Sequence, residues 1–345
     1  MNLDLDYLLA FGEELINIPS VGGDCDQCMA RVKQELEALG LSVTETNKRA
    51  LIATQKGEVD EGRIICAHVD TLGAIVRRIL PDGRLRVLPV GGTTWGAYEA
   101  ENCYVRTRSG KDISATLMPD KASRHTYGEE CTTMVRDDDH VNLRLDEEVH
   151  CPEDVLALGI DVGDTVWFEP RFRKLSSGYV KSRYLDDKIC VAAMITALKK
   201  MQEENIKPHY TIHWMITNFE EVGHGISVVP EGTTECVAVD IAIVAPGTNS
   251  DEHCLSILAR DSRTPYDQKM KNRLRTLAEG AGCDVRIDTP YRYGSDASVG
   301  ALAGFDYNFS AFGPGTDASH HYERTHIKAL DYTARLVYAY ATEGK

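Results

Sequence analysis

The sequence has no run of about 18 apolar residues, so we expect no membrane-spanning helix. Basic residues are in the minority, with 38 Lys and Arg against 53 Asp and Glu and a formal net charge of −15. That charge opposes binding to nucleic acid and to anionic membranes. The N-terminal stretch, MNLDLDYLLAFGEEL, lacks the basic flank and the cleavage pattern of a signal peptide. We therefore expect a cytoplasmic protein with neither nucleic-acid nor membrane partners.

No second CxxC motif accompanies Cys25-x-x-Cys28, so a four-cysteine structural zinc site is not expected. The pair alone could be redox-active or half of a zinc site. The apolar spacing that follows Cys28 instead favours an amphipathic helix with both cysteines on one face. The ten cysteines are scattered along a chain that is long enough to fold without disulfides, and reduced thiols fit the cytosol.

A length of 345 residues suggests about two domains. Helical and strand patterns alternate in residues 1–72 and again in 179–345, which predicts one α/β domain. Residues 73–178 show only short alternating strands, separated by turn signals such as Pro81-Asp82-Gly83, with one short helix near 152–158. There are no internal repeats and no low-complexity linker. We predict a small all-β domain inserted into an α/β domain.

Helices are expected at residues 2–17, 24–39, 187–204, 265–281, 296–303 and 327–342. Strands of the α/β domain are expected at residues 42–46, 51–55, 62–67, 209–217, 237–245, 254–259, 284–288 and 306–311. Six strands are expected in the insert, with the sequences GAIVRRI, RLRVLPV, YVRTR, DISATLM, VNLRL and TVWFEP.

Two adjacent carboxylates, Glu220 and Glu221, follow the apolar run HYTIHWMI and precede Gly223. Taken alone, such a pair is most often a solvated strand end. If the pair is buried, the two charges repel each other and need a cationic neighbour. A metal ion is the obvious candidate.

Other His and Asp residues lie at the ends of predicted strands or at helix starts, where α/β folds place their active sites. They are His68, Asp70, Asp186, Asp187, Asp240, His320 and His321. Singly, His68 could be a core histidine, Asp186 a helix N-cap, and His320 and His321 solvated. Asp240 lies in the apolar run CVAVDIAIVA, predicted as a strand, where an unpaired carboxylate would be costly. Together they favour a carboxylate and imidazole metal site.

Histidines and carboxylates without a cysteine suit Zn²⁺, Co²⁺ or Mn²⁺. The candidates fall at five places in the sequence, and five ligands are too many for one tetrahedral zinc that keeps an open position. They suit two ions that share a bridging carboxylate, about 3.5–4 Å apart, and that activate a water and polarise a carbonyl.

Four motifs carry a resemblance that runs essentially from end to end of the chain. AHVDTLG at 67–73 is similar to AHxDxxG, and FEEVG at 219–223 to EEVG. LDDK at 185–188 is similar to a DDR-type motif with Lys188 in place of Arg, and GSDA at 294–297 to GTDA. The chain resembles the dinuclear metallo-aminopeptidases, which include glutamyl, deblocking and tetrahedral aminopeptidases. Members of this family are sometimes labelled cellulase or endoglucanase.

The resemblance implies a mixed-sheet α/β/α metallopeptidase core, made of 1–72 and 179–345, with a barrel-like insert at 73–178. It implies that Asp186 bridges two divalent ions. One ion would be completed by His68 and Asp240, the other by Glu221 and a C-terminal histidine. Glu220 would be the general base, and Asp70 would support the centre near His68 or the base.

Two segments depart from the family pattern. Its C-terminal histidine usually lies in an HSxxE-like segment, whereas this chain has SHHYERTH at 319–326, which favours His320 over His321. Gly223-His224-Gly225 stands in place of a Gly-x-Arg-Gly segment.

The resemblance implies an aminopeptidase that removes N-terminal residues from peptides with a free α-amine, in a protein that we already expect in the cytoplasm. A metal-bridging hydroxide would attack the scissile carbonyl while Glu220 moves the proton. Zinc is the expected metal, with cobalt or manganese as alternatives. Acidic side chains such as Glu220 or Asp296 would face the substrate ammonium. The insert would shape the mouth of the site and build a homo-oligomer, often a dodecamer in this family.

Three other functions remain as alternatives. A deacylase, dipeptidase or carboxypeptidase could use the same metal scaffold, although the all-β insert argues against them. A glycoside hydrolase needs two carboxylates about 5–10 Å apart across the sugar, whereas the adjacent Glu220 and Glu221 would diverge. A metal-binding protein without catalysis would not need Glu220 in addition to the ligands.

Overall fold

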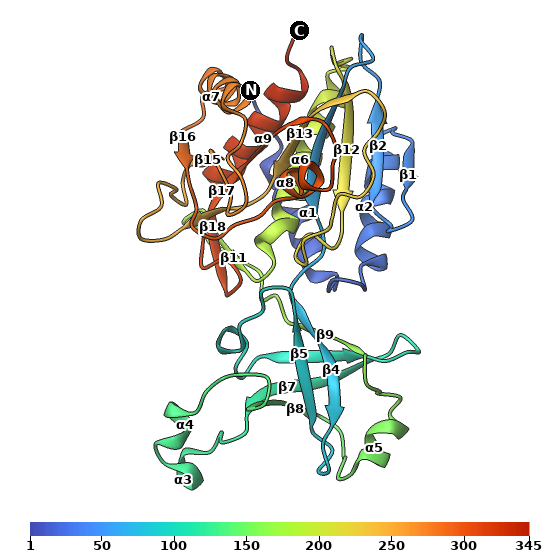
Figure 1. The fold of residues 1–345 in the computed structure, drawn as a ribbon, viewed down its shortest axis with the longest axis vertical. Helices are drawn as coiled ribbons and strands as arrows, with labels where there is room; N and C mark the ends of the chain where they lie inside the picture. Colours follow the sequence, from blue (N-terminus) through green and yellow to red (C-terminus); the bar gives the residue numbers. More distant parts are fainter. Residues whose placement is uncertain (345) are drawn as a thin grey trace. The chain divides into compact units, whose positions relative to one another are not determined.

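The chain divides into two compact units in the computed structural model, which describes residues 1–344 (Figure 1). The larger unit comprises Met1–Asp70 and the chain from Arg171 onward, and the smaller unit is Thr71–Pro170. The predicted boundaries lie after residues 72 and 178. Strands β10 and β11, which follow Arg171, pair with each other in the sheet of the larger unit.

The helices of the larger unit are α1 (Leu5–Asn17), α2 (Asp26–Ala38), α6 (Leu185–Glu203), α7 (Gln268–Gly280), α8 (Asp296–Leu302) and α9 (Ile327–Ala341). Its strands are β1 (Val43–Glu45), β2 (Leu51–Gln55), β3 (Gly62–His68), β10 (Arg173–Lys174), β11 (Tyr179–Ser182), β12 (Thr211–Thr217), β13 (Thr233–Val239), β14 (Ala242–Val244), β15 (Leu255–Leu258), β16 (Val285–Asp288), β17 (Asn308–Asp317) and β18 (Glu323–His326).

These strands form one 12-stranded mixed sheet with the order β1-β2-β12-β3-β13-β17-β18-β11-β10, while β14 and β15 also pair with β17. The central strands β12, β3, β13 and β17 are parallel. Strand β2 pairs antiparallel to β12, β15 and β18 pair antiparallel to β17, and β16 pairs parallel to β15. The near-continuous apolar sequences of the central strands are typical of parallel strands that are covered on both faces.

Alternate side chains of the central strands pack into two cores, one on each face of the sheet. In β3, Ile65 and Ala67 face the core formed with α1, α2, α6, α7 and α9. Ile64 and Cys66 face the opposite core, which contains Ala297 of α8. The predicted α/β/α layering and the mixed sheet are thus confirmed.

Helix α6 runs through the larger core, and 15 of its 19 residues are buried. It packs against α1 and α9 on the same face of the sheet. No helix among residues 1–344 is long and apolar enough to cross a membrane.

The smaller unit is a closed barrel with the strand order β4-β5-β8-β7-β6-β9. The barrel strands are β4 (Gly73–Ile79), β5 (Leu85–Val90), β6 (Asn102–Arg106), β7 (Asp112–Pro119), β8 (Val141–Leu145) and β9 (Thr165–Phe168). Strand β7 shows the alternation most clearly, because Ile113, Ala115 and Leu117 point into the core and their neighbours do not. All six predicted strands and the predicted barrel-like fold are confirmed.

Short helices lie in the connections between the barrel strands: η1 (Trp95–Ala97), α3 (Arg124–Tyr127), α4 (Glu130–Thr133) and α5 (Pro152–Ala157). Only α5 was predicted. The others are single turns, which are too short to show a helical period in the sequence.

The prediction of one strand over 237–245 is wrong at Asp240. Strand β13 ends at Val239 and β14 begins at Ala242, because the chain moves from pairing with β3 and β17 to pairing only with a later part of β17. Asp240 therefore lies just beyond the strand end. Its N–H donates to the carbonyl of Phe312, at 3.0 Å.

Cys25 and Cys28 lie at the start of α2, with Cys25 at the N-cap position, and both are buried and unpaired. The predicted helix is confirmed. All ten cysteines are free.

Candidate metal centre

Three parallel strands end at the same level and bring the predicted residues together. His68, the last residue of β3, is the register partner of Thr217, the last residue of β12. Ala238 of β13 pairs with Cys66, so Asp240 follows its strand at the level of His68. Carboxyl ends of parallel strands commonly hold the active site of an α/β fold.

Asp186 lies between two histidines that come from opposite ends of the chain. Its Oδ1 is 3.2 Å from Nε2 of His68, and its Oδ2 is 3.7 Å from Nε2 of His320. His320 also lies 3.5 Å from Oε2 of Glu221. Asp186 therefore does not act as the simple helix N-cap that its position in the sequence allowed.

Two overlapping groups of side chains offer ligand atoms that all lie within 4.8 Å of one another. One group is His68, Asp186 and Glu221, and the other is His68, Asp187 and Asp240. His68 belongs to both groups, whereas the resemblance made Asp186 the shared residue. Asp187 was a candidate in the sequence, but it was not assigned to the ligand set.

Asp70 connects His68 with the two adjacent glutamates. Its Oδ1 and Oδ2 accept hydrogen bonds from the N–H groups of Glu220 and Glu221, both at 3.1 Å. Its Oδ1 is also 3.4 Å from Nδ1 of His68. Because Asp70 is fully buried, these contacts fix the backbone that carries both glutamates.

Glu323 holds the backbone of two residues of the centre, a role that was not predicted from the sequence. Its carboxylate accepts hydrogen bonds from the N–H groups of Asp186, at 3.1 Å, and His320, at 3.3 Å. The signal was the spacing of His320 and Glu323 within the segment that departs from the family pattern. His321, the alternative ligand, is exposed.

The electrostatics of the centre favour a cation. Burial raises the pKa of Glu220 and of Glu221 well above the usual range of a glutamate. Burial and the charge of Asp186 raise the pKa of Asp240 to about 8. Burial opposes the charge of His68, but the neighbouring carboxylates of Asp186 and Asp70 raise its pKa well above 6.5. The cluster thus concentrates more negative charge than its histidines can balance.

Two buried polar atoms in the cluster also have no hydrogen-bond partner, namely Nε2 of His68 and Oδ1 of Asp187. Orphaned groups of this kind are rare unless an ion or water completes them. The side-chain atoms that could bind a metal are histidine nitrogens and carboxylate oxygens, which suit zinc, cobalt or manganese. The residues present therefore fit a metal.

Asp296 does not take the predicted place opposite a substrate ammonium. It is buried, and its two oxygens accept hydrogen bonds from Oγ1 of Thr217 and from the N–H of Ile226, the latter at 3.2 Å. Burial raises its pKa to about 6. A Cβ on Gly225 would lie 2.2 Å from its Oδ1, so this glycine permits the close approach.

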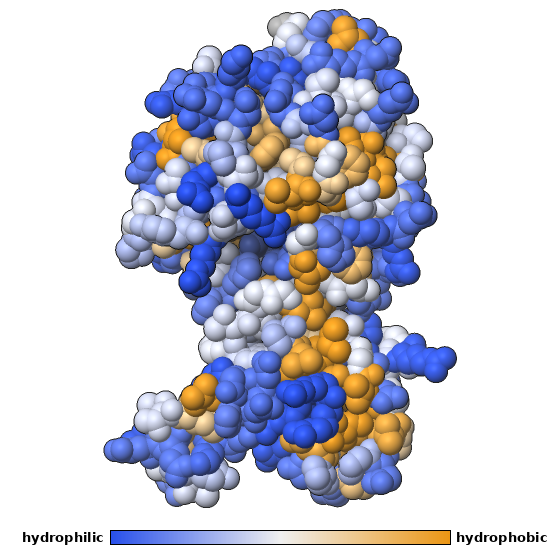
Figure 2. Space-filling model, in the orientation of Figure 1, coloured by the Kyte–Doolittle hydropathy of each residue, from blue (hydrophilic) through white to orange (hydrophobic). Residues whose placement is uncertain are grey.

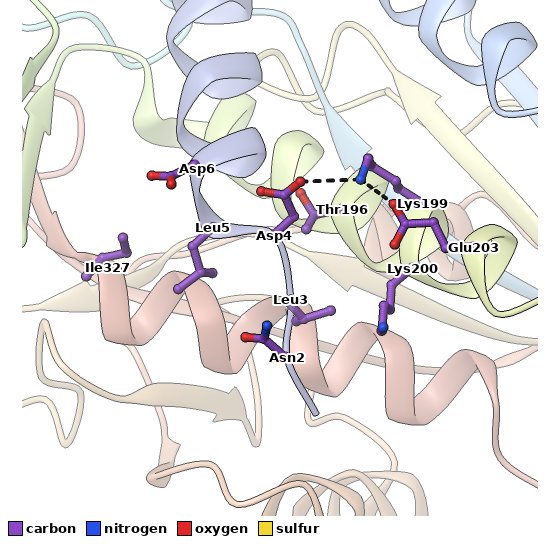
Figure 3. A pocket seen from close by; sticks show the side chains of 10 residues that line it. All are labelled: Asn2, Leu3, Asp4, Leu5, Asp6, Thr196, Lys199, Lys200, Glu203 and Ile327. Carbon is purple, nitrogen blue, oxygen red and sulfur yellow. Dashed lines mark hydrogen bonds and ion pairs between the residues drawn. The ribbon is translucent and has the colours of Figure 1, made fainter.

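A separate pocket of about 650 Å³ lies between the start of α1, α6 and the first residue of α9 (Figure 3). Lys199 lies between Asp4 and Glu203 there, so its charge is already paired. None of the metal-centre residues lines this pocket.

Comparison with known proteins agrees with the fold. A model of the M42 glutamyl aminopeptidase family matches residues 50–336. YhfE of Bacillus subtilis (strain 168), to which an aminopeptidase activity is provisionally assigned, is 39% identical over 330 residues, 95% of each chain.

Two solved structures share the fold. The aminopeptidase APDkam598 of the archaeon Desulfurococcus kamchatkensis has a TM-score of 0.88 and 21% identity, over 99% of this chain and 96% of its own. The TET1 peptidase of Pyrococcus horikoshii, which can assemble into a tetrahedron or a large octahedral shell, has a TM-score of 0.84 and 22% identity, over 97% and 99%. The family model and YhfE, which both cover most of the chain, confirm the predicted aminopeptidase enzyme: the chain belongs to the M42 glutamyl aminopeptidase family.

Proposed function

We propose that this aminopeptidase uses two divalent metal ions, held by His68, Asp186, Glu221, Asp240 and His320. The observation that carries the proposal is the position of Asp186, whose two oxygens lie 3.2 Å from His68 and 3.7 Å from His320. A carboxylate that faces ligands on both sides can bridge two ions.

The ligands then fall into two sets around Asp186. His68 and Asp240 would complete one set, and Glu221 and His320 the other. Asp187 lies within reach of His68 and Asp240, and its Oδ2 accepts a hydrogen bond from the N–H of His68, at 3.2 Å. Its free oxygen Oδ1 makes it a further candidate ligand of the first ion. Zinc is the expected metal, with cobalt and manganese as alternatives.

Two ions at this centre would polarise the scissile carbonyl and lower the pKa of the attacking water. Glu220 lies beside the ligands, with Oε2 3.6 Å from Nε2 of His68, but belongs to neither ligand group. Its carboxylate can therefore accept the proton of the attacking water and deliver it to the leaving amine. Asp70 holds the backbone of Glu220 for this transfer.

The substrates would be peptides with a free α-amine, because the carboxylate of Glu220, which belongs to neither ligand group, can face an ammonium. A matched set of one peptide in free, N-acetylated and C-amidated form tests this, with the products identified by mass spectrometry. We expect stepwise loss of N-terminal residues from the free and C-amidated forms and no cleavage of the acetylated form. Release of C-terminal residues, or turnover of N-acyl amino acids while free peptides are ignored, would overturn the aminopeptidase assignment of this site.

The enzyme would act in the cytoplasm as a homo-oligomer of twelve copies, like the dodecamer described for another solved structure of this fold. Its ten free cysteines fit a reducing compartment, and recovery of the activity in the soluble cytosolic fraction would test that location.

The barrel unit is the proposed assembly surface. Figure 2 shows apolar side chains at the surface of this unit, and Ile75 and Leu88, which are cross-strand partners on β4 and β5, are 37% and 39% exposed. Ile75→Asp with Leu88→Asp should lower the molar mass measured by light scattering, while Val228→Asp in the other unit should not. An unchanged mass in the double variant would remove these strands from the interface.

A further inference from the structure

The loop from Asn218 to Gly225 carries both Glu220 and Glu221, and its backbone begins in an unfavourable conformation. Phe219 has a φ of 63°, in the left-handed region that residues other than glycine seldom adopt. Such a conformation persists only where the surroundings hold it. The contacts around this loop therefore decide where the carboxylate of Glu220 lies.

Two of these contacts come from residues already described. The carboxylate of Asp70 accepts hydrogen bonds from the N–H groups of Glu220 and Glu221. The carboxylate of Asp296 accepts a hydrogen bond from the N–H of Ile226, just after the loop. Between these two anchors the loop turns, with the N–H of His224 donating to the carbonyl of Phe219 at 3.0 Å.

Lys48 holds this turn, and it comes from a part of the chain about 170 residues away. Its Nζ lies 2.9 Å from Nδ1 of His224 and also donates to the carbonyl of His224. The same ammonium lies 5.6 Å from the centre of the Phe219 ring, a cation–π distance.

The rings of Phe219 and His224 are stacked, with centroids 5.0 Å apart and an interplanar angle of 19°. The backbone of Lys48 adds a further contact, since its carbonyl accepts a hydrogen bond from Nδ2 of Asn218, at 2.8 Å. Lys48 thus contacts the residues at the start and at the end of the segment that contains the two glutamates.

The turn that presents Lys48 is itself fixed by local hydrogen bonds. The N–H of Thr46 donates to the carbonyl of Ala50 at 2.9 Å, and the N–H of Ala50 donates to Oγ1 of Thr46 at 3.1 Å. This turn joins β1 to β2 at the edge of the sheet. A fixed donor that reaches a strained loop can define its position.

We propose that Lys48 is a positioning residue for the reaction, which acts through Phe219 and His224 to hold the loop that presents Glu220. This inference rests on the proposed function of Glu220 as the general base. The ammonium fixes the orientation of the His224 peptide and the stack of the two rings, and these set the backbone from which Glu220 extends. Small displacements of a catalytic group are costly, about 10²-fold in rate for a shift near 1 Å.

Three variants test the proposal. Lys48→Met keeps the length of the side chain but removes its charge and its donors. Lys48→Arg restores a cation that can reach the same acceptors. Arg49→Met is the matched control, because it removes a positive charge from the same turn, where Arg49 pairs with the exposed Asp26 and does not reach the loop.

Three measurements are compared across the variants: kcat and KM, the metal content, and hydrogen–deuterium exchange of the peptides that cover 218–226. For Lys48→Met we expect a fall in kcat of about 10- to 100-fold, a nearly unchanged KM and metal content, and faster exchange confined to 218–226. Lys48→Arg should recover most of kcat and of the protection. Arg49→Met should match the wild type.

Exchange and kcat that stay at the wild-type values in Lys48→Met would overturn the proposal. Equal effects of Lys48→Met and Arg49→Met would also overturn it, because the charge of the turn would then matter more than the contacts. A failure of the proposed base would look different, since Glu220→Gln would then keep its activity while the loop in Lys48→Met still exchanged faster.

Discussion

Glu220→Gln is expected to lower kcat by about 10²–10⁴-fold, the usual contribution of a general base, while the protein keeps its metal ions. Glutamine keeps the shape of the side chain but cannot accept the proton of the attacking water. Glu220 belongs to neither group of ligand atoms, so its replacement should leave the ligand set intact. Turnover of a free peptide and metal content, both measured on the same purified sample, test this prediction.

Glu221→Gln is the matched comparison, because it makes the same chemical change one residue along the same loop. Glu221 groups with His68 and Asp186 and lies 3.5 Å from His320, so its replacement should weaken metal binding first. Its activity should recover in part when the metal concentration is raised, and that of Glu220→Gln should not. Equal loss of metal from the two variants would mean that the roles of the adjacent glutamates are assigned wrongly.

Asp186→Asn should have an effect of similar size for a different reason. It removes the negative charge that both proposed ions share, so the metal content after dialysis should fall for both sites together. We expect activity to fall by about 10³-fold or more, because the carbonyl and the water lose their polarising ions. The measurement is turnover with increasing zinc, cobalt or manganese, together with metal analysis and a thermal unfolding curve.

Asp306→Asn is the control for Asp186→Asn, since it removes one exposed carboxylate from the same unit. It should retain wild-type metal content and activity. If Asp186→Asn lost a single ion and kept the other with wild-type affinity, Asp186 would not be the shared ligand. Asp187, which groups with His68 and Asp240, would then take a larger part in the centre.

Much of the fold could be predicted from the sequence, because the patterns of its elements are local. The period of apolar residues located α1, α2, α6, α7 and α9, and alternation located the six barrel strands. Strand β18 was missed because only Thr325 in its sequence, Glu323-Arg324-Thr325-His326, favours a strand. The other three residues are polar or charged. Its place in the sheet depends on pairing with β11 and β17, which no local pattern reveals.

The candidate metal centre could also be predicted in part. Histidines and aspartates at the ends of apolar runs converge when those runs become neighbouring parallel strands. The structure brings His68, Glu221, Asp240 and His320 together in this way, since they follow or end strands β3, β12, β13 and β17, whereas Asp186 comes from the start of α6.

Asp70 was predicted as a supporting residue, but the roles of Glu323 and Lys48 were missed, since they depend on contacts between distant parts of the chain. Glu323 acts through the backbone N–H groups of Asp186 and His320, and any carboxylate with that reach would serve. Lys48 lies in the turn between β1 and β2, where a lysine is usually solvent-exposed and has no specific role. Only the folded chain shows that its ammonium contacts the loop of the two glutamates.

Titration of the metal-free enzyme tests the central claim most directly. Activity on a free peptide is followed while zinc, cobalt or manganese is added, and the bound metal is counted per chain at each step. The two-metal proposal predicts that activity rises to its maximum only as the second ion binds. Full activity with one ion per chain, and no further change when a second ion binds, would contradict it.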